Sequence, residues 1–325
     1  MREVVFIKKN KDKWLRYEDL LTRNRYIDPE ELTRIYLEIT DDLAYANTYY
    51  SDSKTTQYLH ELAGFAHRKI YKTKKTGRNA LIRFYLHDFP LMFYPYRKYL
   101  VFSLLIFLLF SAIGAFSIAQ DADFVRLIMG DAYVDMTLEN IEKGDPMAVY
   151  KQAHEVDMFL GITINNIKVA LYTFMMGALL GLGTLYYLIR NAVMLGSFQY
   201  FFFEKGVGWE SVRTIWIHGT IEIFVIIVAG AAGFIMASGI LMPGTYTRKQ
   251  AFIQKARDGL KVMISTIPFF IIAGFLEGFV TRHTEMPNWL AILIIALSLS
   301  LMIYYYFILP QHIFNQNQQN HEKSL

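Results

Sequence analysis

One apolar stretch, residues 209–243, constrains the fold of this chain more than any other feature. It reads WESVRTIWIHGTIEIFVIIVAGAAGFIMASGILMP and exceeds the roughly 20 apolar residues with which a helix crosses a bilayer. Glu210 and Arg213 lie at its start, and two further ionisable residues, His218 and Glu222, lie inside its apolar part. An ionisable side chain in lipid costs about 2.5 kcal/mol or more, so such groups normally face protein or water. The stretch therefore predicts a transmembrane helix with one face turned towards other helices.

Composition extends this conclusion to the whole chain. Of its 325 residues, 54% are hydrophobic, and the mean hydropathy is +0.23. Soluble globular proteins are about 45–50% apolar. Several apolar runs account for the excess, so we expect an all-α fold: a polytopic helical membrane bundle of five to six segments, preceded by a soluble helical domain. The chain has no cysteine, which excludes a disulfide framework and a thiolate metal site.

The apolar runs divide the chain into three parts. Residues 1–95 are expected to form a cytoplasmic helical domain that ends in a basic juxtamembrane segment. Residues 96–310 are expected to form the transmembrane domain, and 311–325 a polar, disordered tail. The expected membrane segments are 99–119, 163–189, 192–203, 213–241, 260–280 and 289–309. Residues 192–203 are few for a crossing, so this segment is either re-entrant or a compressed span.

The distribution of charge predicts the orientation. Basic residues crowd residues 67–83, directly before the first apolar run, whereas residues 120–161 are acidic. Basic segments stay on the cytoplasmic side, so we expect a multi-pass protein of the cell (inner or cytoplasmic) membrane with a cytoplasmic N-terminus. The second basic stretch, 248–261, is cytoplasmic only if 192–203 crosses, which favours six segments over five. The first basic segment indicates contact with anionic lipid rather than with nucleic acid.

Small residues recur on the apolar runs. Small residues spaced four apart let helix backbones approach closely in membranes. The following glycines are therefore expected at helix contacts: Gly177, Gly181, Gly230, Gly233, Gly274 and Gly278.

Polar residues in different apolar runs are expected at one membrane depth. His218 and Glu222 lie near the start of one run, and Glu277 lies near the end of the next. Because consecutive membrane-crossing helices run antiparallel, the start of the first run and the end of the second lie at the same membrane depth. A single polar cavity is thus predicted to be lined by Asn166, His218, Glu222, Glu277 and Thr281.

Three interpretations of this cluster compete. The first is a polar clamp that holds the helices together through hydrogen bonds. The second is a proton or ion path that uses Glu222 and Glu277. The third is a metal site on His218, Glu222 and Glu277, since imidazole and carboxylate bind divalent ions. The HxxxE spacing is not the HExxH of zinc proteases, so the sequence predicts no catalytic residue and no cofactor.

The second half of the chain resembles a known family. The ordered motifs are Asn165-Asn166, GALLGLGT at 177–184, Asn191 with Leu195-Gly196, His218-Gly219-x-x-Glu222, Ala229-Gly230-x-x-Gly233, Pro243-Gly244 and Glu277-Gly278-Phe279-x-Thr281. They are similar to those of the stage II sporulation protein M family, also called DUF95. The first half looks like the extension of its longer members. The resemblance implies a polytopic membrane protein, and a role in envelope remodelling with peptidoglycan-degrading partners.

Function is predicted in three ranked hypotheses. The first is a non-enzymatic membrane scaffold or accessory subunit of a cell-envelope complex, bacterial by the family resemblance, with membrane or cytoplasmic protein partners. A homo-oligomer is compatible with it. The second is a transporter or permease subunit with a proton- or ion-coupled polar cavity. The third is an intramembrane metal-dependent hydrolase.

Overall fold

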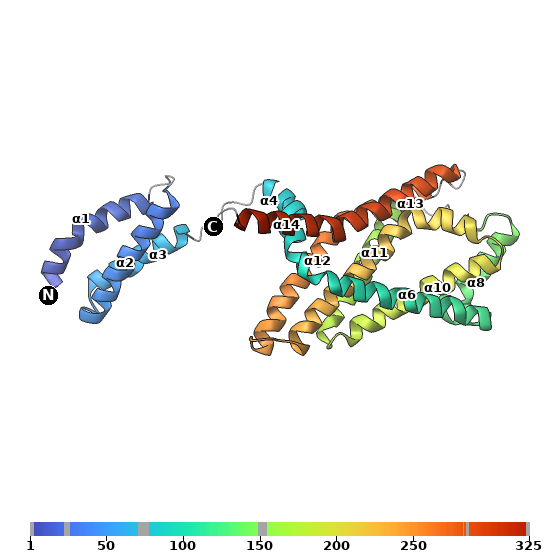
Figure 1. Ribbon diagram of the computed structural model, residues 1–325, viewed down its shortest axis with the longest axis horizontal. Helices are drawn as coiled ribbons and strands as arrows, with labels where there is room; N and C mark the ends of the chain where they lie inside the picture. The colour runs from blue at the N-terminus through green and yellow to red at the C-terminus, as the bar shows by residue number, and fades with distance from the viewer. Residues whose placement is uncertain are drawn as a thin grey trace. The chain divides into compact units, whose positions relative to one another are not determined.

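A computed structural model describes residues 3–22, 27–70, 78–148, 155–281, 283 and 286–322. All regular structure within these ranges is helical, without a strand, which confirms the all-α fold class. The chain divides into two compact units, Met1–Ala80 and Leu81–Leu325. The helices of each unit pack against one another (Figure 1).

The first unit is built from three helices, α1 (Glu3–Thr22), α2 (Pro29–Tyr49) and α3 (Lys54–Ile70). The side chain of Asp28 caps α2 by accepting a hydrogen bond from the backbone N–H of Glu30 at 3.1 Å. Apolar residues from all three helices form one core: Phe6, Trp14, Tyr17, Leu21, Leu32, Ile35, Ile39, Ala46, Leu59, Leu62 and Ala66.

Hydrogen bonds tie α1 to α2 across the edge of this core. Trp14 Nε1 donates to Asp42 at 2.7 Å, and the Tyr17 hydroxyl donates to Glu38 at 2.6 Å. Burial, the hydrogen bond to Glu38 and the nearby carboxylate charge raise the pKa of Tyr17 to about 12. The phenol therefore keeps its proton and donates throughout the neutral range.

The second unit contains the apolar helices. Short helical segments lead into it: α4 (Arg78–Arg83), η1 (Phe84–Asp88), α5 (Phe89–Phe93) and η2 (Tyr94–Tyr96). The long helices and their connections are α6 (Arg97–Gln120), α7 (Phe124–Met129), α8 (Asp131–Glu142), α9 (Glu155–Met175), η4 (Met176–Ala178), α10 (Leu182–Glu204), α11 (Gly208–Leu241), α12 (Arg248–Phe275), η5 (Leu276–Thr281), α13 (Asn288–Ile303), η6 (Tyr304–Ile308) and α14 (Leu309–Glu322).

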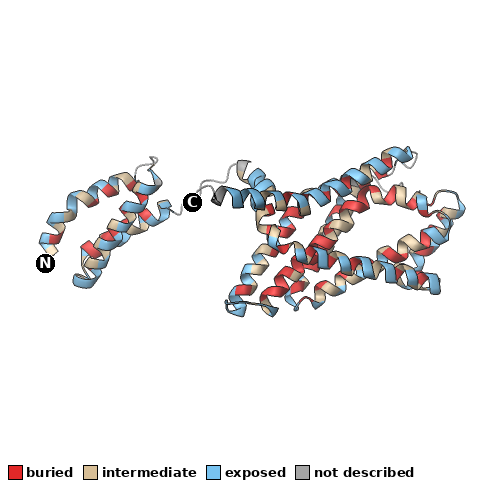
Figure 2. Ribbon diagram, viewed as in Figure 1, coloured by how far each residue is buried: buried red, intermediate tan, exposed pale blue. Residues whose placement is uncertain are grey.

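Helix α11 is the centre of the second unit. It is buried along most of its length, unlike the helices around it (Figure 2), and it contacts α6, α9, α10, α12 and α13. Small residues allow this crowding. A Cβ at Gly177 would overlap the backbone of Gly233, and a Cβ at Gly230 would overlap Ser103 of α6. Ser103 also donates to the carbonyl of Ile227 at 2.7 Å.

Five helices of the described chain are long and apolar enough to cross a membrane: Ala80–Gln120, Phe159–Ala178, Gly208–Leu241, Arg248–Thr281 and Asn288–Gln319. Helix α10 is less apolar but has 23 residues, about 34 Å of helix. Its first turn packs on Gly233 and Ala237 of α11, and Gln199 near its end bonds Ser211 and Trp216. Because α10 covers the same depth as α11, the geometry favours a sixth crossing.

The structure corrects two of the expected membrane segments. The expected span 163–189 is wrong as one helix, because the chain reverses after η4: Leu180 and Gly181 adopt φ of 55° and 83°, in the left-handed region. The short segment 192–203 is instead the second half of α10. Arg190-Asn191 does not end that helix, since the Asn191 amide donates to the Tyr187 carbonyl at 2.7 Å.

The expected disordered tail is also corrected. Residues up to Glu322 continue α14 as a helix. Phe314 stacks on Tyr94 with ring centroids 4.0 Å apart, and Arg97 donates to Gln311 at 2.9 Å. These contacts fix one face of a segment whose composition is otherwise polar.

The crossing number leads to a labelling prediction. Single cysteines at Glu142 and Gln254, both exposed, are introduced into the cysteine-free chain and treated with a membrane-impermeant thiol reagent in intact cells. With six crossings and a cytoplasmic N-terminus, the cysteine at 142 reacts and the cysteine at 254 reacts only after lysis. Reaction of both in intact cells contradicts six crossings and indicates five.

Candidate functional site

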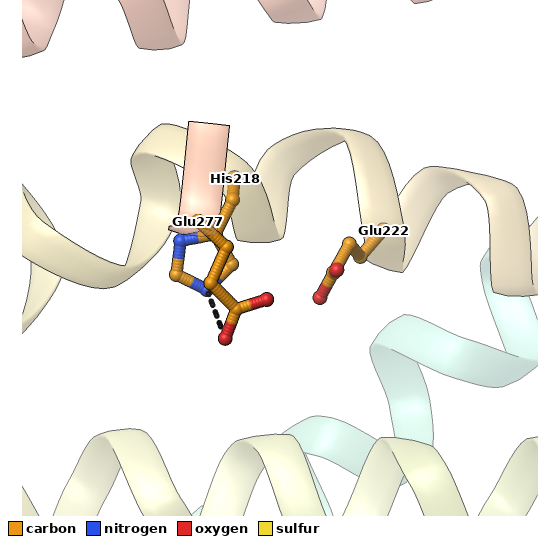
Figure 3. Close-up of side chains that lie close together, drawn as sticks. All are labelled: His218, Glu222 and Glu277. Atoms are coloured by element: carbon orange, nitrogen blue, oxygen red, sulfur yellow. Dashed lines mark ion pairs between the residues drawn. The ribbon is translucent and has the colours of Figure 1, made fainter. Parts of the chain in front are cut away.

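The polar residues of the central helix meet those of η5. His218 and Glu222 lie one turn apart on α11, and Glu277 comes from η5 at the end of α12 (Figure 3). One ligand-type atom from each lies within 4.8 Å of the others. His218 and Glu277 are 3% and 6% exposed, whereas Glu222 is intermediate. The structure thus places two carboxyl groups and an imidazole inside the bundle.

Two further residues orient this group. Asn166 on α9 donates through Nδ2 to Glu222 Oε1 at 2.5 Å. His218 Nδ1 lies 2.9 Å from the hydroxyl of Thr281. All five residues that the sequence assigned to a polar cavity therefore lie together, each in contact with at least one other. We call them the His-Glu cluster: Asn166, His218, Glu222, Glu277 and Thr281.

Helix direction explains this arrangement. α12 runs antiparallel to α11, since Gly239 packs on Ala251 and His218 meets Thr281. α9 runs parallel to α11, since Asn166 meets Glu222 and Gly177 meets Gly233. The end of α12 and the middle of α9 therefore lie at the depth of the first turns of α11.

A widened turn completes the cluster. Residues Leu276–Thr281 form a π-helix, and the Thr281 hydroxyl donates to the Leu276 carbonyl at 3.1 Å. Single π-turns inside α-helices occur frequently at functional sites. Here Glu277 and Thr281 both lie against His218, as predicted from their spacing of four residues, but the π-turn itself was not predicted from the sequence.

The Thr281 hydroxyl lies within hydrogen-bond distance of both the Leu276 carbonyl and His218 Nδ1. When the hydroxyl donates its one proton to Leu276, its oxygen accepts from His218 Nδ1–H. In the neutral ring Nε2 then carries a lone pair, and it points at Glu277 Oε1, 3.7 Å away. The other oxygen of that carboxyl, Glu277 Oε2, is buried and has no hydrogen-bond partner among the described residues.

The predicted packing glycines fall into two groups. Gly177, Gly230, Gly233 and Gly274 lie at close helix contacts, where an added Cβ would overlap a neighbour. Gly181 instead caps α10 with a positive φ, and Gly278 is buried in η5. Further contacts of this kind were missed from the sequence, among them those of Gly114 on the Val193 backbone, Gly196 on the Ser111 backbone and Gly239 on the Ala251 backbone. Leu195-Gly196 was noted only as a family motif.

Two hollows of the second unit lie away from this cluster. A cavity of about 500 Å³ has an apolar lining that includes Phe107, Leu195 and Phe224. A cavity of about 430 Å³ is lined by residues that include Phe102, Leu185 and Phe234. Neither is lined by a member of the His-Glu cluster, whose side chains contact one another directly.

Comparisons with known proteins agree with this architecture. The family model described as stage II sporulation protein M matches residues 103–282, which include the whole His-Glu cluster. A domain of unknown function, DUF8413, matches residues 4–72. An uncharacterized protein of Methanocaldococcus jannaschii is 26% identical over 152 residues, which cover 45% of this chain and 67% of that protein. No solved structure matches. The chain is a multi-pass membrane protein that belongs to the stage II sporulation protein M family.

Proposed function

We propose that the protein is a membrane-embedded scaffold or accessory subunit of a cell-envelope complex. One observation carries this proposal: the chain joins two separately folded units, and each matches a different family model. The second unit anchors the protein in the membrane. The first unit, with its own core of three helices, is suited to recruit a soluble or membrane partner.

Charge supports an orientation for this scaffold. Arg68 and Lys69 at the end of α3 and Arg83 in α4 flank a basic segment, of which Lys72, Lys74 and Lys75 lie outside the described residues. Basic residues beside a first crossing favour the cytoplasmic face and anionic lipid. We therefore propose that the first unit is cytoplasmic.

The family resemblance suggests the type of complex. It implies peptidoglycan-degrading partners in envelope remodelling for the named member of the family, and the same partner class is proposed here. The direct contacts within the His-Glu cluster favour a structural role over an open catalytic cleft. Metal-dependent hydrolysis remains the third hypothesis, since the site residues do not present a separate general base.

Co-purification tests the scaffold with a matched pair of variants. Trp14 is 3% exposed, so Trp14→Ala is expected to lower the free energy of unfolding of the first unit by about 3–5 kcal/mol, which unfolds the unit. Leu15, next in the chain, is 49% exposed, and Leu15→Ala leaves the unit folded. Full-length protein is extracted in mild detergent, and the proteins that co-purify are quantified by mass spectrometry. Wild type and Leu15→Ala are expected to retain a peptidoglycan-active partner. Trp14→Ala loses it.

Two results contradict the scaffold. Equal recovery of partners with Trp14→Ala shows that the first unit recruits nothing. Stoichiometric recovery of an ATPase in place of an envelope enzyme supports a permease subunit instead.

A second candidate function is proton- or ion-coupled transport. It is favoured by the facing carboxyl groups of Glu222 and Glu277, one of which is partly exposed. Two adjacent carboxylates in a membrane are costly, so a pair of this kind takes up a proton or a cation.

Proteoliposomes test this second candidate. Under an imposed membrane potential, wild type is expected to carry protons into vesicles loaded with a pH-sensitive dye. Glu222→Gln keeps the shape of the side chain and is expected to abolish the flux, whereas Glu204→Gln at the exposed end of α10 leaves it unchanged. Wild-type flux no greater than that of empty vesicles excludes the transport candidate.

A further inference from the structure

We propose that His218, Glu222 and Glu277 bind one divalent first-row transition-metal ion, of the class of Zn²⁺ or Mn²⁺, inside the membrane bundle. This inference assigns a ligand to the His-Glu cluster and is independent of the partner proposed above. Four observations carry it: the ligand-type atoms that converge, their spacing, the side chains that orient them, and the route by which an ion enters.

Ligand-type atoms of three side chains converge in the cluster. Nε2 of the His218 ring and Oε1 of Glu277 face each other at 3.7 Å, and a carboxyl oxygen of Glu222 completes a group within 4.8 Å. Glu277 Oε2 is buried without a partner among the described residues. Buried polar atoms are nearly always bonded, so this oxygen is available to a further partner. A divalent ion satisfies these atoms and neutralises both carboxylates at once.

The spacing suits a small divalent ion. Two ligand atoms bound at about 2.0–2.1 Å stand about 3.3 Å apart at the tetrahedral angle and about 4.2 Å apart in line. The 3.7 Å between Nε2 and Oε1 falls within this range. The remaining separations, at most 4.8 Å, close with a small rotation of the partly exposed Glu222 side chain.

The donor set selects the class of ion. Imidazole suits zinc, iron and related transition ions, whereas carboxylate oxygen suits both these and manganese. Magnesium and calcium favour oxygen ligands alone, so one imidazole among three ligands disfavours them. Three protein ligands leave a fourth tetrahedral position for water, as in catalytic rather than closed structural zinc sites.

Neighbouring side chains orient two of the three ligands, His218 and Glu222, as in known metal sites. A metal-bound histidine usually donates its other ring N–H, which fixes its tautomer. Here the Thr281 hydroxyl is the partner of His218 Nδ1, so Nε2 is turned to the carboxylates. Asn166 holds Glu222 by its Oε1, leaving the second oxygen of that carboxylate for an ion.

The position of the cluster gives an ion access. Glu277 lies about one turn before the end of η5, and Glu222 is partly exposed. At the same end of the bundle, Val134 of α8 and Ile215 of α11 belong to one apolar cluster. Helix α8 carries four carboxylates, of which Asp131 and Asp135 pair with Arg126, Glu139 pairs with Lys143, and Glu142 is exposed.

Metal content of the full-length protein tests the site. The protein is purified in detergent with its affinity tag removed and without chelator, and its metals are measured by mass spectrometry. About one equivalent of a transition metal per chain is expected, or one equivalent of Zn²⁺ taken up on titration after chelation, with a higher melting temperature. No metal in either state overturns the proposal.

Variants locate the ion. His218→Ala, Glu222→Gln and Glu277→Gln are each expected to lose it, and Asn166→Ala is expected to weaken Zn²⁺ binding by about 10–100-fold. Glu204→Gln is the matched control and retains one equivalent. Retention of the ion by all three ligand variants overturns the site.

A spectroscopic measurement covers ligand variants that do not fold. X-ray absorption of the zinc-loaded wild type is expected to show nitrogen and oxygen ligands at about 2.0–2.1 Å with one imidazole. A bound ion without imidazole in its coordination shell overturns the assignment.

Discussion

The structure depends on a close approach of two backbones within the membrane unit. Gly177, in η4 directly after α9, packs on Gly233 of α11, and a Cβ at Gly177 would overlap the Gly233 carbonyl. The hydrophobic effect does not drive helices together in lipid, so packing contacts of this kind decide which helices associate and in which register. Thr184 of α10 packs on the same glycine, so three helices meet at this point.

This contact also sets the geometry of the His-Glu cluster. Asn166 precedes Gly177 by eleven residues, and Glu222 precedes Gly233 by the same number. Eleven residues make about three helical turns. Because α9 and α11 run parallel, the glycine contact at one depth places Asn166 against Glu222 three turns away. The polar site and the packing face are therefore consequences of one register. A cation bound by the His-Glu cluster would then link α11 to η5 at the Asn166–Glu222 end of the contact between α9 and α11.

The sequence was sufficient where a pattern repeats within one helix. The length and apolar character of 209–243 predicted the central helix, and the antiparallel order of the apolar runs put Glu277 at the depth of His218. The sequence was insufficient where the geometry depends on contacts with other segments of the chain. The reversal at Leu180-Gly181, the continuity of α10 through Asn191 and the π-turn before Thr281 all rest on backbone angles or contacts that composition does not encode. The helical end of the chain likewise depends on the stacking of Phe314 on Tyr94.

The most direct measurement compares two glycine substitutions on the same segment of chain. Gly177→Ala forces a Cβ against the Gly233 backbone, whereas Gly161→Ala on α9 meets nothing within 4 Å. The free energy of unfolding in mixed micelles is expected to fall by about 1–3 kcal/mol for Gly177→Ala. For Gly161→Ala it is expected to stay equal or rise by up to about 1 kcal/mol. Equal stability of the two variants would contradict the claim that the Gly177–Gly233 contact sets the register of the bundle.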